Sequence, residues 1–255
     1  MDHELGAALA SAARTISKPA TLDETLTTIV DTARNSLPGF DEVGISTFDH
    51  KGAVHTRAGT SDFVWELDRI QYSLAEGPCV DSLREASVVV APRIQDDQRW
   101  PRYAPRAARL GLKSQLAVRL YLDDEGTLGG LNIYSTTSED IDVDAESIAE
   151  LFATHAAIAL GNAREVDTLQ EALRTRKVIG QALGMLMTEY TLDEDAAFGL
   201  LVRTSSVTNV KLRDIAAAMV EQANARAGSE TGTKPGAHGS RPVDPIRNLI
   251  KDRQH

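Results

Sequence analysis

The feature that most constrains this chain is a helical pattern that continues from about Val143 to Thr188. In its first part, apolar positions alternate at spacings of three and four, which is typical of a long helix with a coiled-coil-like seam. The seam residues are Ile148, Leu151, His155, Ile158, Asn162, Val166, Leu169 and Leu173. The two polar residues of this seam, His155 and Asn162, either set the register between two copies of the chain or lie at the solvent-exposed edge of an ordinary helix.

The residues before this helix switch repeatedly between helical and strand-like periods. Thr21 and Glu24 form a capping-box pattern at the start of a helix that should stop at Pro38. Strands are expected at 43–48, 53–57, 88–90, 114–122 and 128–135, and further helices at 3–17, 61–71, 79–86 and 100–110. Helices that flank a mostly antiparallel sheet predict an α+β domain.

The residues after Thr188 predict a three-helix unit at the end of the long helix. Thr191 is a candidate cap for a helix over 193–204, and Thr208 or Asn209 should start a last helix that continues through Ala223. The residues of the long helix expected to face inward here are Leu173, Ile179, Leu183 and Leu186. The final segment, rich in Gly, Pro, Ser and charge, predicts a flexible tail.

Charge is distributed unevenly along the 255 residues. The net charge is −10, and residues 1–163 carry 14 Lys/Arg against 25 Asp/Glu, a net of −11. Residues 164–222 carry 7 Lys/Arg against 9 Asp/Glu, a net charge of −2. Residues 223–255 carry 6 Lys/Arg against 3 Asp/Glu, a net charge of +3. The acidity therefore belongs to the first domain, and the nearly neutral remainder permits nucleic-acid binding without demanding it.

Several classes of protein are disfavoured by the composition. Cys79 is the single cysteine, so no internal disulfide can form, which suits a reducing cytosol. We find no stretch apolar and long enough to cross a bilayer and no signal peptide, and we expect a cytoplasmic protein. His50, His55 and His155 lack the spacing of metal ligands. With no nucleophile elbow and no phosphate-cradling glycine loop, we expect neither an enzyme nor a cofactor-binding protein.

The segment 169–223 contains three ordered motifs, RTRKVIGQALGMLM, DEDAAFGLLVRTSS and TNVKLRDIA. It closely resembles the ANTAR domain, a three-helix RNA-binding output module of bacterial antitermination regulators. Many members of that family have a basic residue where this chain has Leu183. If the basic residue of those members binds RNA, this chain must obtain part of its RNA affinity from other residues, for example from Arg176 and Lys177.

Residues 20–163 resemble a GAF sensory domain through LGGLNIYS and AESIAELFATHAAIALGNA. The stretch EGPCVDSLREASVVVAPRIQDDQRWPRYAP looks like the GAF domains that are fused to ANTAR modules in actinobacteria. The resemblance predicts a dimerisation helix at 1–19, a GAF domain at 20–163, an ANTAR domain at 164–225 and a flexible tail at 226–255. GAF domains elsewhere bind various small effectors, so the input signal, a small molecule or a protein, stays open.

The resemblance implies that the ANTAR module binds paired hexaloop stem-loops in nascent mRNA and promotes transcription antitermination. Cations suit phosphates, and polar groups suit exposed bases. The candidate RNA-binding residues are Arg174, Arg176, Lys177, Gln181, Arg203, Ser205, Asn209, Lys211 and Arg213. The alternative is that these residues are merely solvated faces of helices.

The overall expectation is a homodimeric GAF–ANTAR regulator. Candidate residues for a GAF pocket are Trp65, Tyr72, Cys79, Trp100 and Tyr103. The four aromatic residues suit an ordinary core equally well, and Cys79 is either a small packing residue or a reactive thiol or attachment point. Two other functions stay open: a DNA-binding transcriptional regulator, since small three-helix units often present a helix to the major groove, and a signalling adaptor that binds only proteins.

Overall fold

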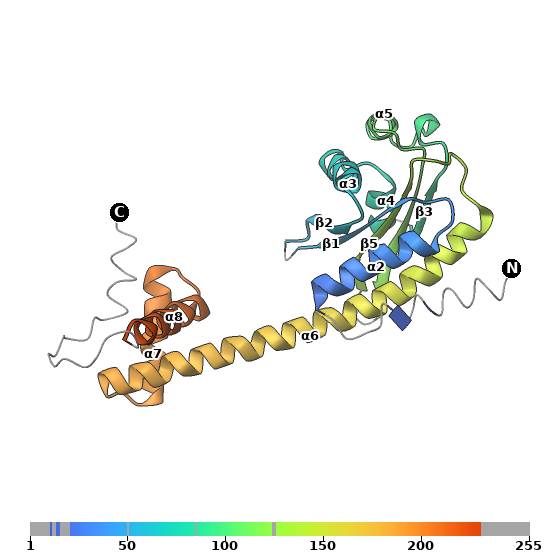
Figure 1. Ribbon diagram of the computed structural model, residues 1–255. Helices are drawn as coiled ribbons and strands as arrows, with labels where there is room; N and C mark the ends of the chain where they lie inside the picture. The colour runs from blue at the N-terminus through green and yellow to red at the C-terminus, as the bar shows by residue number, and fades with distance from the viewer. Residues whose placement is uncertain are drawn as a thin grey trace. The chain divides into compact units, whose positions relative to one another are not determined.

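The computed structural model describes residues 11, 14–15, 21–49, 51–84, 86–123 and 126–230 (Figure 1). The chain divides into two compact units, residues 1–167 and 168–255, which are considered separately here. Most of the N-terminal helix expected at 3–17 and most of the expected tail lie outside the described residues. Within those residues, no helix is long and apolar enough to cross a membrane.

A five-stranded antiparallel sheet forms the centre of the first unit. Its strand order is β2-β1-β5-β4-β3, and β5 pairs with both β1 and β4. The strands are β1 (Glu42–Phe48), β2 (Val54–Gly59), β3 (Val88–Ala91), β4 (Ser114–Leu122) and β5 (Gly126–Ser135). The α+β class predicted from alternating hydrophobicity is confirmed.

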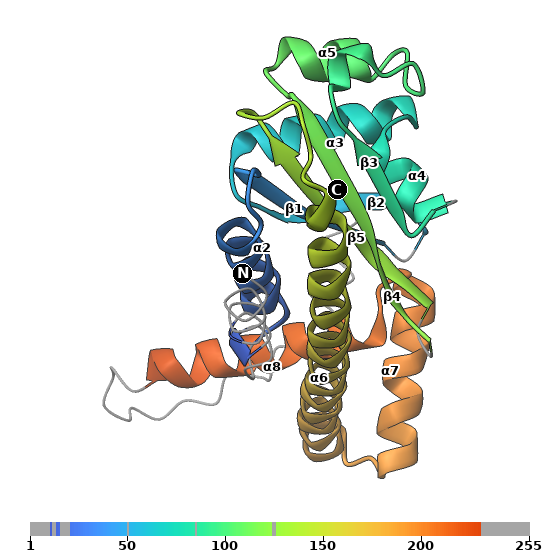
Figure 2. The ribbon, with the colours of Figure 1, turned by 90° about the vertical axis from the view of Figure 1, so that its right-hand side faces the viewer.

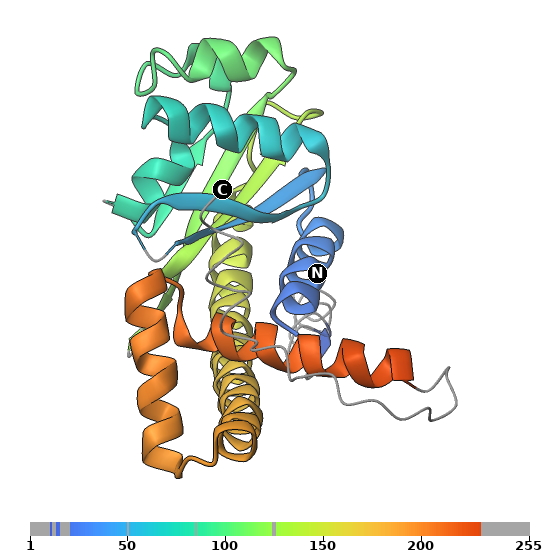
Figure 3. The same cartoon turned by 90° about the vertical axis from the view of Figure 1, so that its left-hand side faces the viewer.

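Helices cover both faces of this sheet. Figures 2 and 3 show α2 and the first part of α6 on one face and α3, α4 and α5 on the other. The helices are α2 (Leu22–Ser36), α3 (Asp62–Leu74), α4 (Pro78–Arg84), α5 (Ala104–Arg109) and α6 (Val143–Tyr190), with a short 3₁₀ turn at Ile94–Asp96. The unit therefore has three layers, with an apolar cluster on each side of the sheet.

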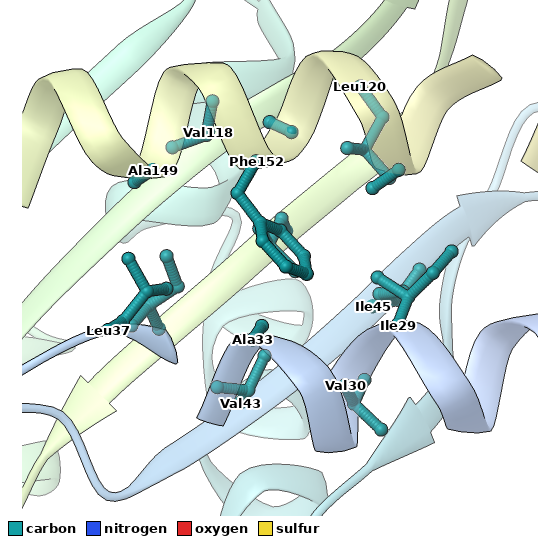
Figure 4. Close-up of a cluster of buried hydrophobic side chains, with 14 of the residues drawn as sticks. Ile29, Val30, Ala33, Leu37, Val43, Ile45, Val118, Leu120, Ala149 and Phe152 are labelled. Atoms are coloured by element: carbon teal, nitrogen blue, oxygen red, sulfur yellow. The ribbon is translucent and has the colours of Figure 1, made fainter. Parts of the chain in front are cut away.

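The main apolar cluster lies between the sheet and the α2/α6 layer (Figure 4). Strand positions alternate in their direction, so Val43 and Ile45 face this cluster while Ser46 faces the opposite layer. The labelled members are Ile29, Val30, Ala33, Leu37, Val43, Ile45, Val118, Leu120, Ala149 and Phe152. Burial of these side chains supplies the main free energy that holds the layer to the sheet.

Local signals set the start of two helices of the first unit. At α2 the predicted capping box is present, with the Thr21 hydroxyl accepting from the Glu24 amide and the Glu24 carboxylate accepting from the Thr21 amide. The helix predicted at 100–110 was wrong at its start, since α5 begins only at Ala104. Pro105 lies in its first turn, where the missing N–H of proline is tolerated, so the helix does not extend back to Trp100.

The second unit packs the last turns of α6 against α7 (Glu194–Thr208) and α8 (Leu212–Glu230). The expected three-helix unit is present, and α8 crosses the end of α6 at a steep angle (Figure 3). Its small core consists of Ala182, Leu186, Ala197, Leu201, Ile215, Ala216 and Met219. Of the α6 residues predicted to face inward, Leu186 is buried, whereas Leu173 is 67% exposed because no described side chain of the core reaches it.

The helix ends of the second unit differ from the prediction. Asp193, rather than Thr191, caps α7 by accepting from the Ala196 amide at 2.8 Å, and Thr191 has a positive φ of 53°. Asn209 does not start the last helix but ends α7, also with φ 53°, a conformation that asparagine tolerates well. α8 then continues to Glu230, so it includes the first five residues of the tail that was expected at 226–255.

Candidate functional site

Three of the predicted RNA-binding residues lie together on one face of α6. At about 100° per residue, Arg174 and Lys177 lie roughly 20° and 40° around the helix from Gln181. All three side chains are exposed. Arg176 is exposed as well but lies about 140° from Gln181, on a different face. The α6 part of the predicted site therefore separates into a three-residue face and one outlying arginine.

Four predicted residues lie where α7 meets α8. Arg203 and Lys211 are exposed, and the backbone carbonyl of Lys211 accepts from the amides that open α8. Ser205 is half-buried and donates its hydroxyl proton to the Val210 carbonyl at 2.7 Å. Asn209 ends α7. Ser205 and Asn209 thus shape this junction, whereas the two cations extend from it into solvent.

Arg213 differs from the other cations because it is paired within the module. Its guanidinium lies 3.0 Å from the Glu171 carboxylate and 3.6 Å from that of Asp214. Arg174, Arg176, Lys177, Arg203 and Lys211 make no ion pair with any residue that the structure describes. Five of the six predicted cations are therefore available to an anionic partner.

The five residues proposed for a GAF pocket lie in different surroundings. Trp65 is 44% exposed. Trp100 is buried and donates its indole N–H to Asp81 at 2.8 Å, and buried Tyr103 donates to the Gln115 carbonyl oxygen at 2.7 Å. Tyr72 and Cys79 are in contact, with 3.6 Å between the hydroxyl oxygen and the sulfur. Trp100 and Tyr103 accordingly belong to the core.

A buried polar network on the α3 side of the sheet was missed by the sequence analysis. Its centre is Asp68, which is 0% exposed. The Asp68 carboxylate accepts hydrogen bonds from the Thr56 hydroxyl at 2.6 Å, from the Asn132 amide at 3.1 Å and from the Tyr134 hydroxyl. Burial raises the pKa of this carboxyl to about 6, although the hydrogen bonds from Thr56 and Tyr134 act in the opposite direction.

The network continues from Asp68 to Cys79 through Ser46 and Tyr72. The Ser46 hydroxyl contacts both the Asp68 carboxylate and the Tyr72 hydroxyl. Burial raises the pKa of the Cys79 thiol to about 12, and the nearby Asp68 charge adds to this shift. The thiol therefore stays protonated at neutral pH, which makes it a poor nucleophile. No cation of the described residues enters the network.

A partly open cavity of about 370 Å³ lies beside this network, between the β1–β2 hairpin and helices α3 and α4. Tyr72 lines it, together with Phe48, Val54, Leu83 and Arg84. Tyr72 thus belongs to both the cavity wall and the polar network. Of the predicted pocket residues, it is the one that borders this cavity. Among the described residues, no group of three or more His, Cys, Asp or Glu side chains is arranged to hold a metal ion.

Comparison with family models assigns both units. The GAF domain model matches residues 19–161, more than half of the chain. This chain belongs to the GAF domain family. The ANTAR domain model matches residues 167–220. The chain therefore combines a GAF domain, a signal-sensing domain, with an ANTAR domain, an RNA-binding antitermination module, as the sequence motifs indicated.

Solved structures resemble the chain in fold at low identity. The photosensory core module of the Stigmatella aurantiaca phytochrome is 15% identical, with a TM-score of 0.53, over 81% of this chain and 45% of that chain. The bacteriophytochrome RpBphP3 of R. palustris is 15% identical, with a TM-score of 0.51, over 72% of this chain and 42% of that chain. The GAF domain of a Coxiella burnetii phosphoenolpyruvate-protein phosphotransferase is 15% identical, with a TM-score of 0.52, over 64% of this chain and 96% of that chain.

These likenesses concern the fold alone. The chain spans less than half of the two phytochrome chains, so their activities do not transfer to it. A search of curated proteins finds no match.

Proposed function

We propose that this GAF–ANTAR chain is a signal-responsive regulator that binds paired hexaloop stem-loops in nascent mRNA and promotes transcription antitermination. The observation that carries the proposal is the set of exposed cations of the ANTAR module that no described residue neutralises. Arg174 and Lys177 lie on one face of α6, and Arg203 and Lys211 lie at the α7–α8 junction. Phosphate groups are the partners that such cations favour.

The polar groups beside these cations support recognition of unpaired RNA. Gln181 shares the α6 face of Lys177, and its amide both donates and accepts hydrogen bonds. Sequence-specific RNA recognition usually targets loops, where base edges are accessible. Binding of two stem-loops would hold the transcript in a form that excludes the terminator hairpin.

We further propose that two copies of the chain pair through α6. Five large apolar side chains of this helix are exposed although they recur at helical spacing: Leu151, Ile158, Val166, Leu169 and Leu173, with exposures of 45%, 44%, 47%, 57% and 67%. A stripe of this kind with His155 and Asn162 interspersed suits a coiled-coil seam. A homodimer presents two ANTAR modules, which matches a pair of stem-loops.

The GAF domain supplies the input in this proposal, and the cavity beside Tyr72 is its candidate effector site. The protein acts by binding rather than by catalysis, and in the cytoplasm, where nascent transcripts are made. The protonated state of Cys79 supports a non-catalytic role for that thiol.

A titration of the full-length protein at fixed salt tests the proposal, because phosphate contacts make affinity depend on salt. Three probes are compared: a tandem hexaloop RNA with loop bases selected from a randomised pool, the same RNA with scrambled loops, and duplex DNA of equal length. Tight binding to the selected RNA alone is expected. Preference for the duplex would favour a DNA-binding regulator, and failure of all three probes would favour a protein-binding adaptor.

A further inference from the structure

The ANTAR module contains a groove of about 610 Å³ between the last turns of α6 and the second half of α8. Its lining runs along α6 from Gln181 to Glu189, a length of about 12 Å along the helix axis. The apolar part of the lining comes from Met185 on α6 and from Val220 and Ala223 on α8, and all three are half-buried. The groove is therefore a partly open apolar channel on the described part of the module.

The middle of the groove is lined by bare backbone. Gly184 is exposed, and a Cβ added to it would meet no atom within 4 Å. Glycine destabilises the interior of a helix relative to alanine, and the packing of the described residues does not require it here. A glycine does allow the backbone of another segment to approach the helix closely. The open space at Gly184 therefore suits an occupant that the described residues do not supply.

The charges of the groove favour a cationic occupant at one end. Among the described residues, no Lys or Arg lines it, whereas Glu189 does. α6 ends at Tyr190, so the partial negative charge of the helix C-terminus adds to that of the Glu189 carboxylate. Glu189 makes no ion pair with any residue that the structure describes. Lys177 precedes the opposite end of the groove, so a cation is favoured only near Glu189.

The end of the chain contains a segment with the matching chemistry. Residues 231–255 lie outside the part of the chain that the structure describes. Their sequence includes Ile246, Leu249 and Ile250, at spacings of three and four, which place these side chains on one face of a helix. Residues 231–255 also carry 5 Lys/Arg against 2 Asp/Glu, a net charge of +3, opposite in sign to the charge of Glu189.

The segment 244–251 has the pattern of a short amphipathic helix. It begins with Asp244 and Pro245, which are residue types that start helices, and it carries two cations, Arg247 and Lys251. The cations are four residues apart, so in a helix they lie on one side, beside the aliphatic face. A helix of this length measures about 12 Å, the same as the lining along α6. Docking of an amphipathic helix in an apolar groove is a recurrent mode of recognition.

The length of the chain allows this segment to reach the groove of its own copy. Asn224 lines the groove, and α8 ends at Glu230, six residues and about 9 Å further on. The connecting residues 231–243 can span at most roughly 45 Å, several times that distance. A short tether sets an effective concentration in the millimolar range, so a weak intrinsic affinity of the segment for the groove is sufficient.

We propose that the groove between α6 and α8 binds segment 244–251 of the same chain, with the three aliphatic side chains on the apolar lining and the two cations toward Glu189. The docked segment covers Gln181, one of the candidate RNA-binding residues. The segment and RNA therefore compete for this face of α6, which makes the end of the chain an autoinhibitory element. The competition rests on the proposed RNA-binding function, whereas the docking itself does not.

Trypsin measures the docking in the full-length protein without RNA. Lys234 and Arg241 are each followed by proline, which blocks cleavage, so Arg247 is the first site after α8 that trypsin can cleave. The rate of cleavage after Arg247 is read from the mass of the product and compared with the rate for a synthetic peptide of residues 241–255. The full-length protein should be cleaved at least tenfold more slowly than the peptide, because the docked segment cannot enter the protease.

Two variants remove the docking from opposite sides. Gly184→Leu fills the groove and should abolish the protection, and the module should stay folded because leucine is a better helix former than glycine. Gly180→Leu is the matched control, since Gly180 is also exposed with open space at its Cβ but does not line the groove. Its protection should change less than twofold. Leu249→Asp, compared with a peptide of its own sequence, should lose the protection without any change in the described part of the module.

The RNA affinity of Leu249→Asp tests the competition. This variant should bind the selected tandem hexaloop RNA about fivefold more tightly than the wild type, because RNA no longer has to displace the segment from Gln181. The substitution adds a negative charge, which by itself would weaken RNA binding. Tighter binding is therefore explained by release of the segment, and weaker binding would overturn the autoinhibitory role.

The outcomes separate this inference from the proposed function. Cleavage of the wild type as fast as the peptide overturns the inference, and so does protection that Gly184→Leu leaves intact. Recovery of protection when Gly184→Leu and Leu249→Asp are mixed would assign the groove to the segment of a second copy and would also overturn it. Protection that Gly184→Leu abolishes, with no RNA bound by any of the proteins, supports the docking and overturns the proposed function alone.

Discussion

The GAF and ANTAR domains use polar side chains in opposite ways. In the GAF domain, Asp68 is completely buried, and its carboxylate is surrounded by hydroxyl and amide donors. In the ANTAR domain, Lys177 and Lys211 are exposed and have no ion-pair partner among the described residues. The first arrangement satisfies its groups internally and fixes how α3 packs on the sheet, whereas the second leaves its groups available to a partner.

The energetic consequences differ accordingly. A buried donor that loses its acceptor costs the full penalty of its desolvation, about 1–3 kcal/mol. Replacement of an exposed cation by a neutral side chain changes the free energy of unfolding very little, because both side chains are solvated by water. Substitutions in the GAF network should therefore appear in the free energy of unfolding, and those on the ANTAR surface should appear in RNA binding.

The largest effect is expected for Asp68→Ala. It leaves the donors of Thr56, Asn132 and Tyr134 without their shared acceptor, and the GAF domain should lose about 4 kcal/mol of stability. Urea unfolding followed by tryptophan fluorescence measures this loss, since the two tryptophans, Trp65 and Trp100, report only on the GAF domain.

Asp62→Ala is the control for this measurement, because Asp62 is on the same helix but exposed in its first turn. It should cost less than about 1 kcal/mol. Equal losses for the two variants would contradict the role assigned to the buried network.

The next effect concerns pH. Burial raises the pKa of Asp68 to about 6 in the folded protein, from the 3.8 that is ordinary for a solvated aspartate. Between these values the folded chain keeps a proton that the unfolded chain has lost, so rising pH disfavours folding. The contribution of Asp68 to GAF stability should thus fall by about 3 kcal/mol in total as the pH rises from about 3 to about 7, and it should stay constant above that range.

Asp68→Asn removes this titration. Subtracting its pH profile of unfolding free energy from that of the wild type cancels the other carboxyl groups, including Glu76 and Asp97, whose pKa values are lowered. The salt bridge of Glu76 with Arg102 and that of Asp97 with Arg99 stay in both proteins. A difference that does not vary with pH would show that Asp68 is ionised throughout this range.

A smaller effect is expected on the ANTAR surface. Lys177→Ala and Lys211→Ala should each weaken binding of the selected tandem hexaloop RNA about tenfold and lower its salt dependence by about one charge. Arg176→Ala removes the same charge from a different face of α6 and should change the affinity less than twofold. The affinities are measured by titration at several salt concentrations. Equal losses of affinity for all three variants would mean that RNA binding depends on the net charge of the module and not on a defined face.

The smallest effect concerns Arg213, which among the predicted RNA-binding cations is the one paired with described residues. Glu171→Gln frees Arg213 from its 3.0 Å ion pair and should tighten RNA binding about twofold at low salt. Glu221→Gln makes the same change of charge on α8 without a known ion pair, and its affinity should stay closer to that of the wild type. If both variants bind RNA more tightly by the same factor, the ion pair of Arg213 with Glu171 does not affect RNA affinity.

Prediction from sequence succeeded where a local pattern decides the structure. The alternation of Leu116, Val118 and Leu120 places one face of β4 in the core, and the Thr21–Glu24 pattern starts α2. The prediction failed at the start of α7, because both Thr191 and Asp193 are residue types that cap helices. Only the positive φ of Thr191, which the sequence does not reveal, rules Thr191 out as the N-cap.

The Asp68 network was missed because its members are far apart along the chain. Ser46, Thr56, Asp68, Asn132 and Tyr134 come from four different elements, and only the folded sheet brings them together. One local signal was available: Asp68 adjoins Leu67 on the apolar face of α3, where an ionisable side chain requires a buried partner. The groove between the last turns of α6 and the second half of α8 in the ANTAR domain had no comparable sequence signal, because it forms only where the two helices pack together.

Transcription through a terminator tests the central claim most directly. A template is built in which the selected tandem hexaloop sequence overlaps an intrinsic terminator, and the full-length transcript is measured in single-round transcription with and without the purified protein. The account predicts that the wild-type protein raises readthrough and that Lys177→Ala combined with Lys211→Ala does not. Tight binding of the same RNA with unchanged readthrough would contradict the claim that this chain promotes antitermination.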